Sequence, residues 1–337
     1  MPFPGADWPT GAIPAGVHLE PLLDEVFDPA GPFHETFAVV AVHGGRIVAE
    51  RYANRLPSFT GDGAVVDADT PLLSWSMAKS MLHALVGILV GDGRIALADR
   101  AAVAEWADPN DPRHAITVEH LLTMRDGLDW REVYSVDAPS DVVTMLFGEG
   151  RPDVAHFAAD RPLASPPDSR YCYSSGSTNI LSRIVATIVG PGEPYESYLR
   201  ERLLDPIGMA SARPTFDEAG TWIASTFLHA TARDFARFGL LHLRDGVWDG
   251  TRILPEGWVD TARVARSTDP DDGRRYSAHW WVAEDGYGSF WANGYEGQSI
   301  LVCPALDLVL VRIGRTDEAG CAHLPGWRLR VVEAFAG

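Results

Sequence analysis

Ser76 and Lys79 form a Ser-x-x-Lys pattern, the arrangement in this chain that points most directly to chemistry. Residues three apart on a helix lie on the same face, so the hydroxyl and the amine are expected to meet. An uncharged amine at that place can take the serine proton and turn the hydroxyl into a nucleophile. Burial favours the uncharged amine, because a buried environment penalises charge.

Lys79 is the only lysine among the 28 lysine and arginine residues of the chain. Arginine supplies a fixed positive charge, whereas lysine can lose its proton when its pKa is modestly lowered. Arginine everywhere else and lysine here therefore indicate a position that needs a titratable amine. Biased codon usage that left a single surface lysine is the competing explanation. The lone lysine also excludes a P-loop, because no GxxxxGK pattern contains it.

A helix predicted over 76–90 must position this pair. Its residues are apolar on most sides, which is typical of a helix buried in the middle of a domain, and Gly91-Asp92-Gly93 is expected to end it. The first turn of a helix has backbone N–H groups without partners inside the helix. Such groups suit the oxyanion that forms during acyl transfer.

The remaining pattern predicts an α/β (α+β) fold with strands near both ends of the chain. A hairpin is expected over 36–53, four strands between 277 and 313, and a closing helix over 327–335. The part between them is mostly helix and loop, with helices predicted from 117, over 179–189, over 195–204 and over 231–243. We therefore expect an antiparallel sheet domain of residues 1–75 and 221–337, a helical subdomain of residues 76–220, and an active site between them.

Composition excludes several classes of function. The 337 residues carry a formal charge of −18, which disfavours a nucleic-acid or anionic-membrane partner. The longest apolar stretch, 82–90, is far shorter than the roughly 20 residues of a membrane span. No targeting segment is visible, so a cytoplasmic location is expected. Cys172, Cys303 and Cys321 form no CxxC, and no histidine pair has convincing metal spacing, so free thiols and no metal are expected.

Several motifs together resemble the serine β-lactamase and penicillin-binding-protein superfamily, in which SxxK carries the nucleophile. The resemblance covers about residues 36–335 and is strongest to the class C-like branch, with its esterase and 6-aminohexanoate-dimer hydrolase relatives. Beyond SMAKS it rests on these segments: TVEHLLTMRDG at 117–127, PDSRYCYSSGSTNIL at 167–181, LDPIGM at 204–209, ATARDFARFGLLHLRDG at 230–246 and GYEGQSILVCP at 294–304.

The resemblance implies a role for Tyr173 as a proton shuttle between serine, lysine and leaving group. The family motif Tyr-x-Asn falls on Tyr173-Ser174-Ser175, with serine in place of asparagine, a form similar to that of the amide-hydrolase relatives. Ser175 is therefore expected near the substrate. A phenol beside a cationic amine can have its pKa lowered and act as a base. Tyr171 is the competing candidate, and a packed core aromatic is the structural alternative.

The third family motif, Lys-Thr-Gly or His-x-Gly, is absent. The matching segment is WANGYEGQ at 291–298, and the resemblance implies that the backbone N–H of Tyr295, next to Gly294, completes the oxyanion hole with that of Ser76. The missing cation argues against β-lactams and D-Ala-D-Ala termini as best substrates.

Tyr134 resembles a tyrosine that closes over substrate in the nylon-dimer hydrolases. Three tryptophans are expected to pack in the core rather than to line a pocket: Trp222, Trp281 and Trp291.

These expectations combine into a serine hydrolase without a cofactor that cleaves a small-molecule ester or amide through an acyl-enzyme on Ser76. Lys79 and Tyr173 would shuttle the proton. One alternative is a binding or regulatory module that has kept the fold and lost catalysis, and another is a D-alanyl-D-alanine peptidase or β-lactamase. The sequence leaves the oligomeric state, the natural substrate and the preference between ester and amide open.

Overall fold

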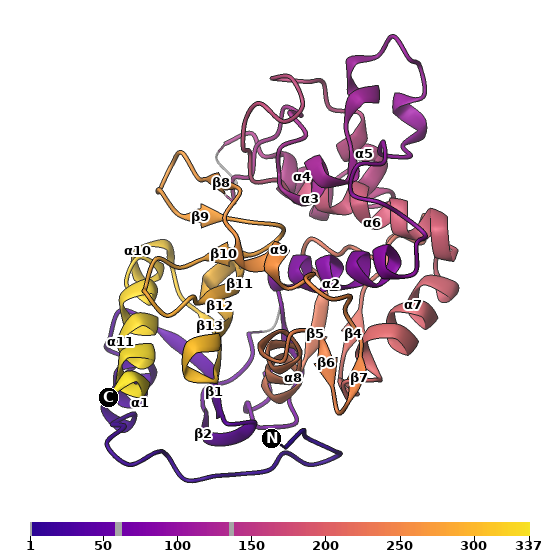
Figure 1. The fold of residues 1–337 in the computed structure, drawn as a ribbon. Helices are drawn as coiled ribbons and strands as arrows, with labels where there is room; N and C mark the ends of the chain where they lie inside the picture. The colour runs from indigo at the N-terminus through magenta and orange to yellow at the C-terminus, as the bar shows by residue number, and fades with distance from the viewer. Residues whose placement is uncertain (1, 58–62, 135–137) are drawn as a thin grey trace.

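A computed structural model describes residues 2–57, 63–134 and 138–337, and its centre is an eight-stranded antiparallel sheet (Figure 1). The spatial order is β2 (Arg46–Tyr52), β1 (Glu35–His43), β13 (Leu308–Arg315), β12 (Gln298–Cys303), β11 (Phe290–Gly294), β10 (Trp281–Val282), β9 (Arg275–Tyr276) and β8 (Ser267–Thr268). The N-terminal hairpin thus pairs with the last strand of the chain, which confirms the prediction that both ends build one sheet.

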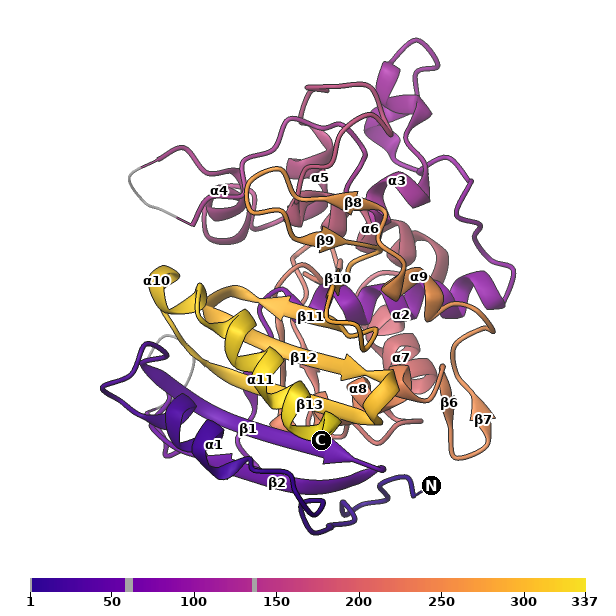
Figure 2. The same cartoon turned by 60° about the vertical axis from the view of Figure 1, so that its left-hand side comes forward.

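Both faces of this sheet are covered, because successive side chains of a strand point to opposite faces. Val40 and Val42 of β1 belong to the core on one face, with α2 (Met77–Gly91) and α8 (Ala232–Leu243). Val39 and Ala41 belong to the core on the other face, with α1 (Glu20–Phe27) and α11 (Leu324–Ala336). Figure 2 shows α1 and α11 lying across their face of the sheet.

The helical part of the chain lies around α2, with most of it above α2 and its last helix below α2 in Figure 1. It contains α3 (Val118–Leu122), α4 (Asp141–Phe147), α5 (Val154–Ala159), α6 (Ser175–Val189) and α7 (Glu193–Leu199), which continues into a π-helical turn at Arg200–Leu204. The proposed division into two domains stays a prediction. The shorter elements are β3 (Leu72–Leu73), β4 (Arg213–Pro214), β5 (Leu228–Ala230), β6 (Val247–Trp248), β7 (Thr251–Arg252), α9 (Asp260–Arg263), α10 (Glu318–Cys321) and 3-10 turns at Ala104–Trp106, Pro112–Ala115, Tyr295–Gly297 and Pro304–Leu306.

The helix α2 matches the predicted helix closely and is buried over nearly its whole length. Every residue from Met77 to Leu89 is buried. Gly87 is required there, because a Cβ at this position would stand 2.3 Å from the Trp258 indole nitrogen. A helix locked in this way holds its first turn in a fixed place, which is what a site at that turn needs.

Some predicted elements differ from the observed ones. The strand expected at the start of the 277–313 region is largely a turn between β9 and β10, which pair antiparallel. His279 in this turn has a φ of 58°, a left-handed conformation that interrupts a strand. Three observed helices, α1, α4 and α5, are not among the elements predicted from the sequence. Among the described residues, no helix is long and apolar enough to cross a membrane.

Candidate active site

Ser76 stands at the start of α2, and its hydroxyl is not used to cap the helix. It instead accepts a hydrogen bond of 2.9 Å from the Nζ of Lys79, one turn further along. The preceding residue, Trp75, has a φ of 46°, in the left-handed region that disfavours a bulky side chain. Strain of this kind persists only where surrounding contacts hold it, and it clusters at functional sites.

Lys79 is 1% exposed and is held by three hydrogen bonds. Besides Ser76, its Nζ donates to the Oγ of Ser175 at 3.0 Å and to the carbonyl oxygen of Ser225 at 2.8 Å. Burial lowers the pKa of Lys79 to about 8, against the opposing effect of the Glu132 carboxylate. A large share of the amine is therefore uncharged in mildly alkaline solution, as its use as a base requires.

Glu132 is the functional residue that sequence reasoning missed. It lies on the segment between α3 and α4, and both of its carboxylate oxygens accept hydrogen bonds. Oε1 accepts from the hydroxyls of Tyr134 at 2.9 Å and Ser175 at 2.5 Å. Oε2 accepts from the backbone N–H of Ser175 at 2.9 Å and the indole N–H of Trp130 at 2.6 Å. Ser175 thus connects the carboxylate to Lys79.

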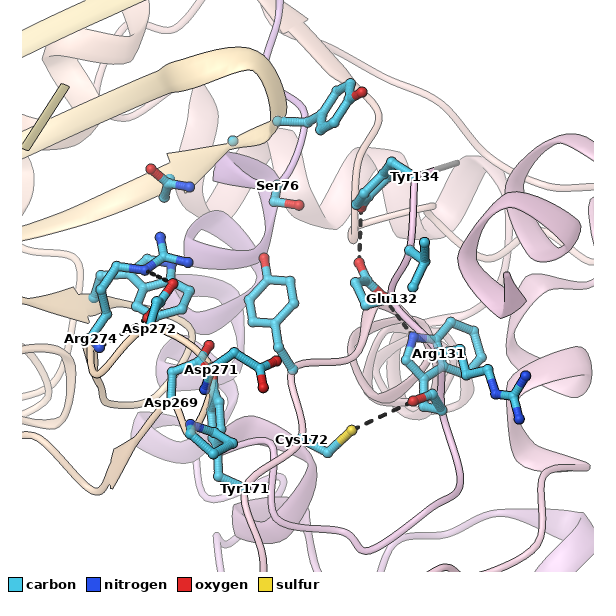
Figure 3. A pocket seen from close by; sticks show the side chains of 18 of the residues that line it. Ser76, Arg131, Glu132, Tyr134, Tyr171, Cys172, Asp269, Asp271, Asp272 and Arg274 are labelled. Carbon is cyan, nitrogen blue, oxygen red and sulfur yellow. Dashed lines mark hydrogen bonds and ion pairs between the residues drawn. The ribbon is translucent and has the colours of Figure 1, made fainter. Parts of the chain in front are cut away.

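A cavity of about 640 Å³ opens in front of Ser76. In Figure 3 the Ser76 hydroxyl points toward the side on which Glu132 and Tyr134 lie, and Arg274 and Asp272 lie on the opposite side. Tyr134 and Tyr295, both in the cavity wall, stack with ring centroids 4.6 Å apart. This pair joins the helical side of the cavity to the sheet side.

Tyr173 lies in the cavity wall, and the Nζ of Lys79 stands over its ring, 5.0 Å from the centroid. The expectation of a lowered pKa for this phenol is wrong. Burial and the Glu132 carboxylate raise its pKa well above the usual value, although the Ser76 hydroxyl acts to lower it. With its pKa raised, the phenol stays protonated. Tyr173 is therefore suited to donate a proton.

Of the other predicted site residues, some line the cavity and one is buried behind its wall. Tyr171 also lines the cavity, but its buried hydroxyl has no hydrogen-bond partner within the described residues. Gly294 and Tyr295 line the cavity at the end of β11. A Cβ on Gly294 would stand 2.6 Å from the backbone oxygen of Ser74, so glycine lets β11 approach the Ser76 turn closely. Ser175 is fully buried behind the cavity wall, in contact with Lys79 and Glu132.

The predictions for the tryptophans and cysteines can also be compared with the structure. Trp222 is fully buried, as expected, whereas Trp281 is buried and also lines the cavity. All three cysteines are free thiols, as expected. The described parts of the chain contain no group of three or more His, Cys, Asp or Glu side chains arranged to hold a metal ion.

Known proteins resemble this chain in sequence and in fold. The chain is 27% identical, over 332 residues, to a 6-aminohexanoate-dimer hydrolase of Paenarthrobacter ureafaciens, covering 92% of this chain and 81% of the relative. The structure superposes on a putative 6-aminohexanoate-dimer hydrolase from Bacillus anthracis with a TM-score of 0.77 at 23% identity, over 98% and 87% of the two chains.

A further solved structure with the same fold is EstCE1, a hydrolase with promiscuous acyltransferase activity. Its TM-score is 0.72 at 16% identity, and the match covers 95% of this chain and 97% of EstCE1. The β-lactamase-like fold is thereby confirmed, and the family points to serine hydrolase activity. The Beta-lactamase family model matches residues 33–323, most of the chain, and the protein therefore belongs to the β-lactamase family.

Proposed function

We propose that this protein is a cofactor-independent serine hydrolase that cleaves small amide or ester bonds through an acyl-enzyme on Ser76. The proposal rests on one contact, the 2.9 Å hydrogen bond between Lys79 Nζ and Ser76 Oγ. The buried amine has a pKa of about 8 and is the only amine side chain in the protein. A serine and a base in hydrogen-bond contact are the pair needed for nucleophilic catalysis.

In the first step, uncharged Lys79 takes the Ser76 proton while the serine oxygen attacks the carbonyl carbon. The negative charge that forms on the carbonyl oxygen is held by the backbone N–H groups of Ser76 and Tyr295. The close approach of β11 at Gly294 to Ser74 supports this placement, because it brings the two segments together.

In the second step, Tyr173 donates its phenol proton to the leaving amine or alcohol, and the Lys79 ammonium replaces that proton. The raised pKa of Tyr173 supports a donor role. Water then attacks the acyl-enzyme and gives up a proton to Lys79. Lys79 passes this proton to the departing Ser76 oxygen as the carboxylic acid is released, which restores the Ser76 hydroxyl and the uncharged amine. The Glu132 carboxylate, reached through Ser175, balances the charge on Lys79 while it holds the proton.

The substrate class proposed is a short-chain ester or short linear amide. The relative from Paenarthrobacter ureafaciens, a 6-aminohexanoate-dimer hydrolase by name, supports an amide. The end of β11 offers Asn293, Gly294 and Tyr295 in place of a cation, which disfavours β-lactams and D-Ala-D-Ala termini. We also propose a cytoplasmic location, with a small-molecule ester or amide substrate as the partner and no nucleic-acid or membrane partner.

A hydrolysis screen tests this proposal. Short-chain p-nitrophenyl esters, linear amides and a chromogenic β-lactam are offered to the wild type and to Ser76→Ala. Turnover of an ester or linear amide that disappears in Ser76→Ala is the expected result. No turnover of any substrate by the wild type would favour the alternative, a binding module that has lost catalysis.

A further inference from the structure

A second cavity, of about 270 Å³, lies between α11 and strands β9 to β12. It is on the sheet face that α1 and α11 cover, and Figure 2 shows these two helices in front of the strands. Its wall is mostly apolar, with Val282, Leu301, Leu329 and Val332 among the residues that line it. Five charged residues also line it, namely Arg274, Arg275, Glu284, Asp285 and Arg328, and of these Arg328 of α11 is the buried one. An apolar hollow with a buried polar anchor is typical of a small-molecule site.

Arg328 is buried without an anion. Its side chain is 6% exposed, and across residues 2–57, 63–134 and 138–337 it has neither a hydrogen-bond acceptor nor an ion-pair partner. Its guanidinium carbon stands 4.9 Å from the centroid of the Trp291 ring. Buried charges in proteins are normally paired, because an isolated charge pays a large desolvation cost. The arginine therefore lacks its usual counterpart.

The surrounding charges do not supply that counterpart. Burial and the positive charges of Arg274 and Arg312 together lower the pKa of Arg328 to about 9. Two carboxylates stand at the rim, but both have other partners. Glu284 accepts from Arg275 at 2.7 Å, and Asp285 accepts from the backbone N–H of Tyr287 at 2.9 Å.

Arg312 shows what a structural buried arginine looks like in the same protein. It is fully buried, and its two terminal nitrogens donate to backbone oxygens and threonine hydroxyls, including Thr36 at 2.9 Å and Thr316 at 2.6 Å. Arg328, which is 6% exposed, has no such acceptors among the described residues. The difference is that Arg328 lines a cavity that an outside molecule can enter.

We propose that this cavity binds a monocarboxylate with a short apolar chain, whose carboxylate pairs with Arg328. The planar guanidinium fork matches a carboxylate in a two-point hydrogen-bonded pair. The apolar wall then covers the chain, and the buried indole N–H of Trp291, which has no acceptor within the described residues, is a further donor in the same wall. A ligand of this class supplies both the missing charge and the missing apolar contact.

The cavity shares a wall with the active-site cavity. Arg274 lines both, and its guanidinium carbon stands 4.0 Å from the centroid of Trp281, which also lines the active-site cavity. Trp281 stacks on Trp291 with ring centroids 6.4 Å apart, and the Arg328 guanidinium lies over the Trp291 ring. Any binding measurement must therefore separate the two cavities, because a carboxylic acid is also the product of the proposed reaction.

Isothermal titration calorimetry of the whole protein with hexanoate tests the proposal. We expect saturable one-to-one binding that persists after Ser76 has been blocked by a covalent phosphonate. Acetate is expected to bind at least tenfold more weakly than hexanoate, and hexylamine not at all. Loss of binding on blocking Ser76, or equal affinity for acetate and hexanoate, would overturn the site as described.

Variants connect the binding to Arg328. Arg328→Gln is expected to weaken hexanoate binding at least tenfold. The control is Arg330→Gln, also in α11, which removes an exposed charge paired with Glu25 of α1 and should leave hexanoate binding unchanged. Leu329→Glu is a second test that does not touch the buried charge, because Leu329 is 39% exposed at the cavity wall. Its added carboxylate should repel the ligand. Unchanged affinity in both Arg328→Gln and Leu329→Glu would contradict the proposal.

Discussion

Lys79 donates a 2.9 Å hydrogen bond to Ser76 from one turn further along the same helix. The contact follows from backbone geometry alone, since positions three apart share a helix face. What makes it chemically useful is burial. The apolar surroundings of α2 lower the pKa of the amine to about 8, where an uncharged form is available.

Replacing Lys79 by arginine should abolish most activity. Arginine keeps the positive charge but cannot become a base near neutral pH. We expect kcat to fall by about 10² to 10⁴-fold, the usual contribution of general acid–base catalysis. Steady-state kinetics measure the loss, and circular dichroism and Tm check that the variant is folded. Near-normal turnover in a folded Lys79→Arg protein would remove Lys79 from the mechanism.

Activity should rise with pH as Lys79 loses its proton. The acid side of the profile of kcat/KM is expected to have its midpoint near pH 8, because kcat/KM reports the free enzyme. The Glu132 carboxylate raises the pKa of Lys79, so Glu132→Gln should move that midpoint to lower pH. Exposed Glu149 lies outside the active-site cavity, and Glu149→Gln is the matched control. A midpoint that stays in place in Glu132→Gln would refute the electrostatic link.

Lys79 should cost the protein stability at neutral pH. Its pKa is about 8 in the folded state against 10.5 when unperturbed, so the folded state binds this proton more weakly than the unfolded state. This shift of the pKa lowers the free energy of unfolding by about 3 kcal/mol. The loss of stability is complete below pH 8 and disappears as the pH rises toward 10.5.

Lys79→Met removes the buried amine and tests this cost directly. Thermal unfolding should show a higher Tm than wild type at pH 7, with an advantage that shrinks between pH 8 and 10. A stability difference of constant size across that pH range would show that burial of Lys79 carries no charge penalty.

The approach of β11 to the Ser76 turn should tolerate no side chain at residue 294. A Cβ there would stand 2.6 Å from the backbone oxygen of Ser74, so Gly294→Ala must push the two segments apart. We expect kcat to fall by about 10 to 100-fold, because small misplacements of catalytic groups are costly. Gly326→Ala is the control, since its nearest neighbour would be 3.9 Å away. Equal kcat in both variants would mean that this contact does not position the site.

The pattern of the sequence predicts local features better than encounters between distant segments. The SxxK pair, its apolar helix and the N-terminal hairpin are short-range patterns, and the structure has them close to the expected bounds. The break at His279 was not predicted, because a left-handed φ in a histidine leaves no mark on the alternation of side chains. A short helix such as α4, with seven residues, contains too few turns for a clear period.

The contacts of Glu132 are the clearest example of a feature that could not be predicted from the sequence. The carboxylate lies 43 positions before Ser175, in a stretch without regular pattern, and its role exists only because four donors converge on it. The length of that irregular stretch was itself the available signal, since long loops in compact domains are usually functional. The raised pKa of Tyr173 was equally hidden, because it depends on burial and on the same carboxylate.

Intact-mass spectrometry after treatment with an active-site phosphonate tests the central claim, that Ser76 is a nucleophile activated by Lys79. The wild type should gain the mass of one adduct, located on the peptide that contains Ser76. The adduct should be absent from Ser76→Ala and slow to form in Lys79→Arg. An adduct that appears equally in Ser76→Ala, or a wild type that never reacts, would contradict the account.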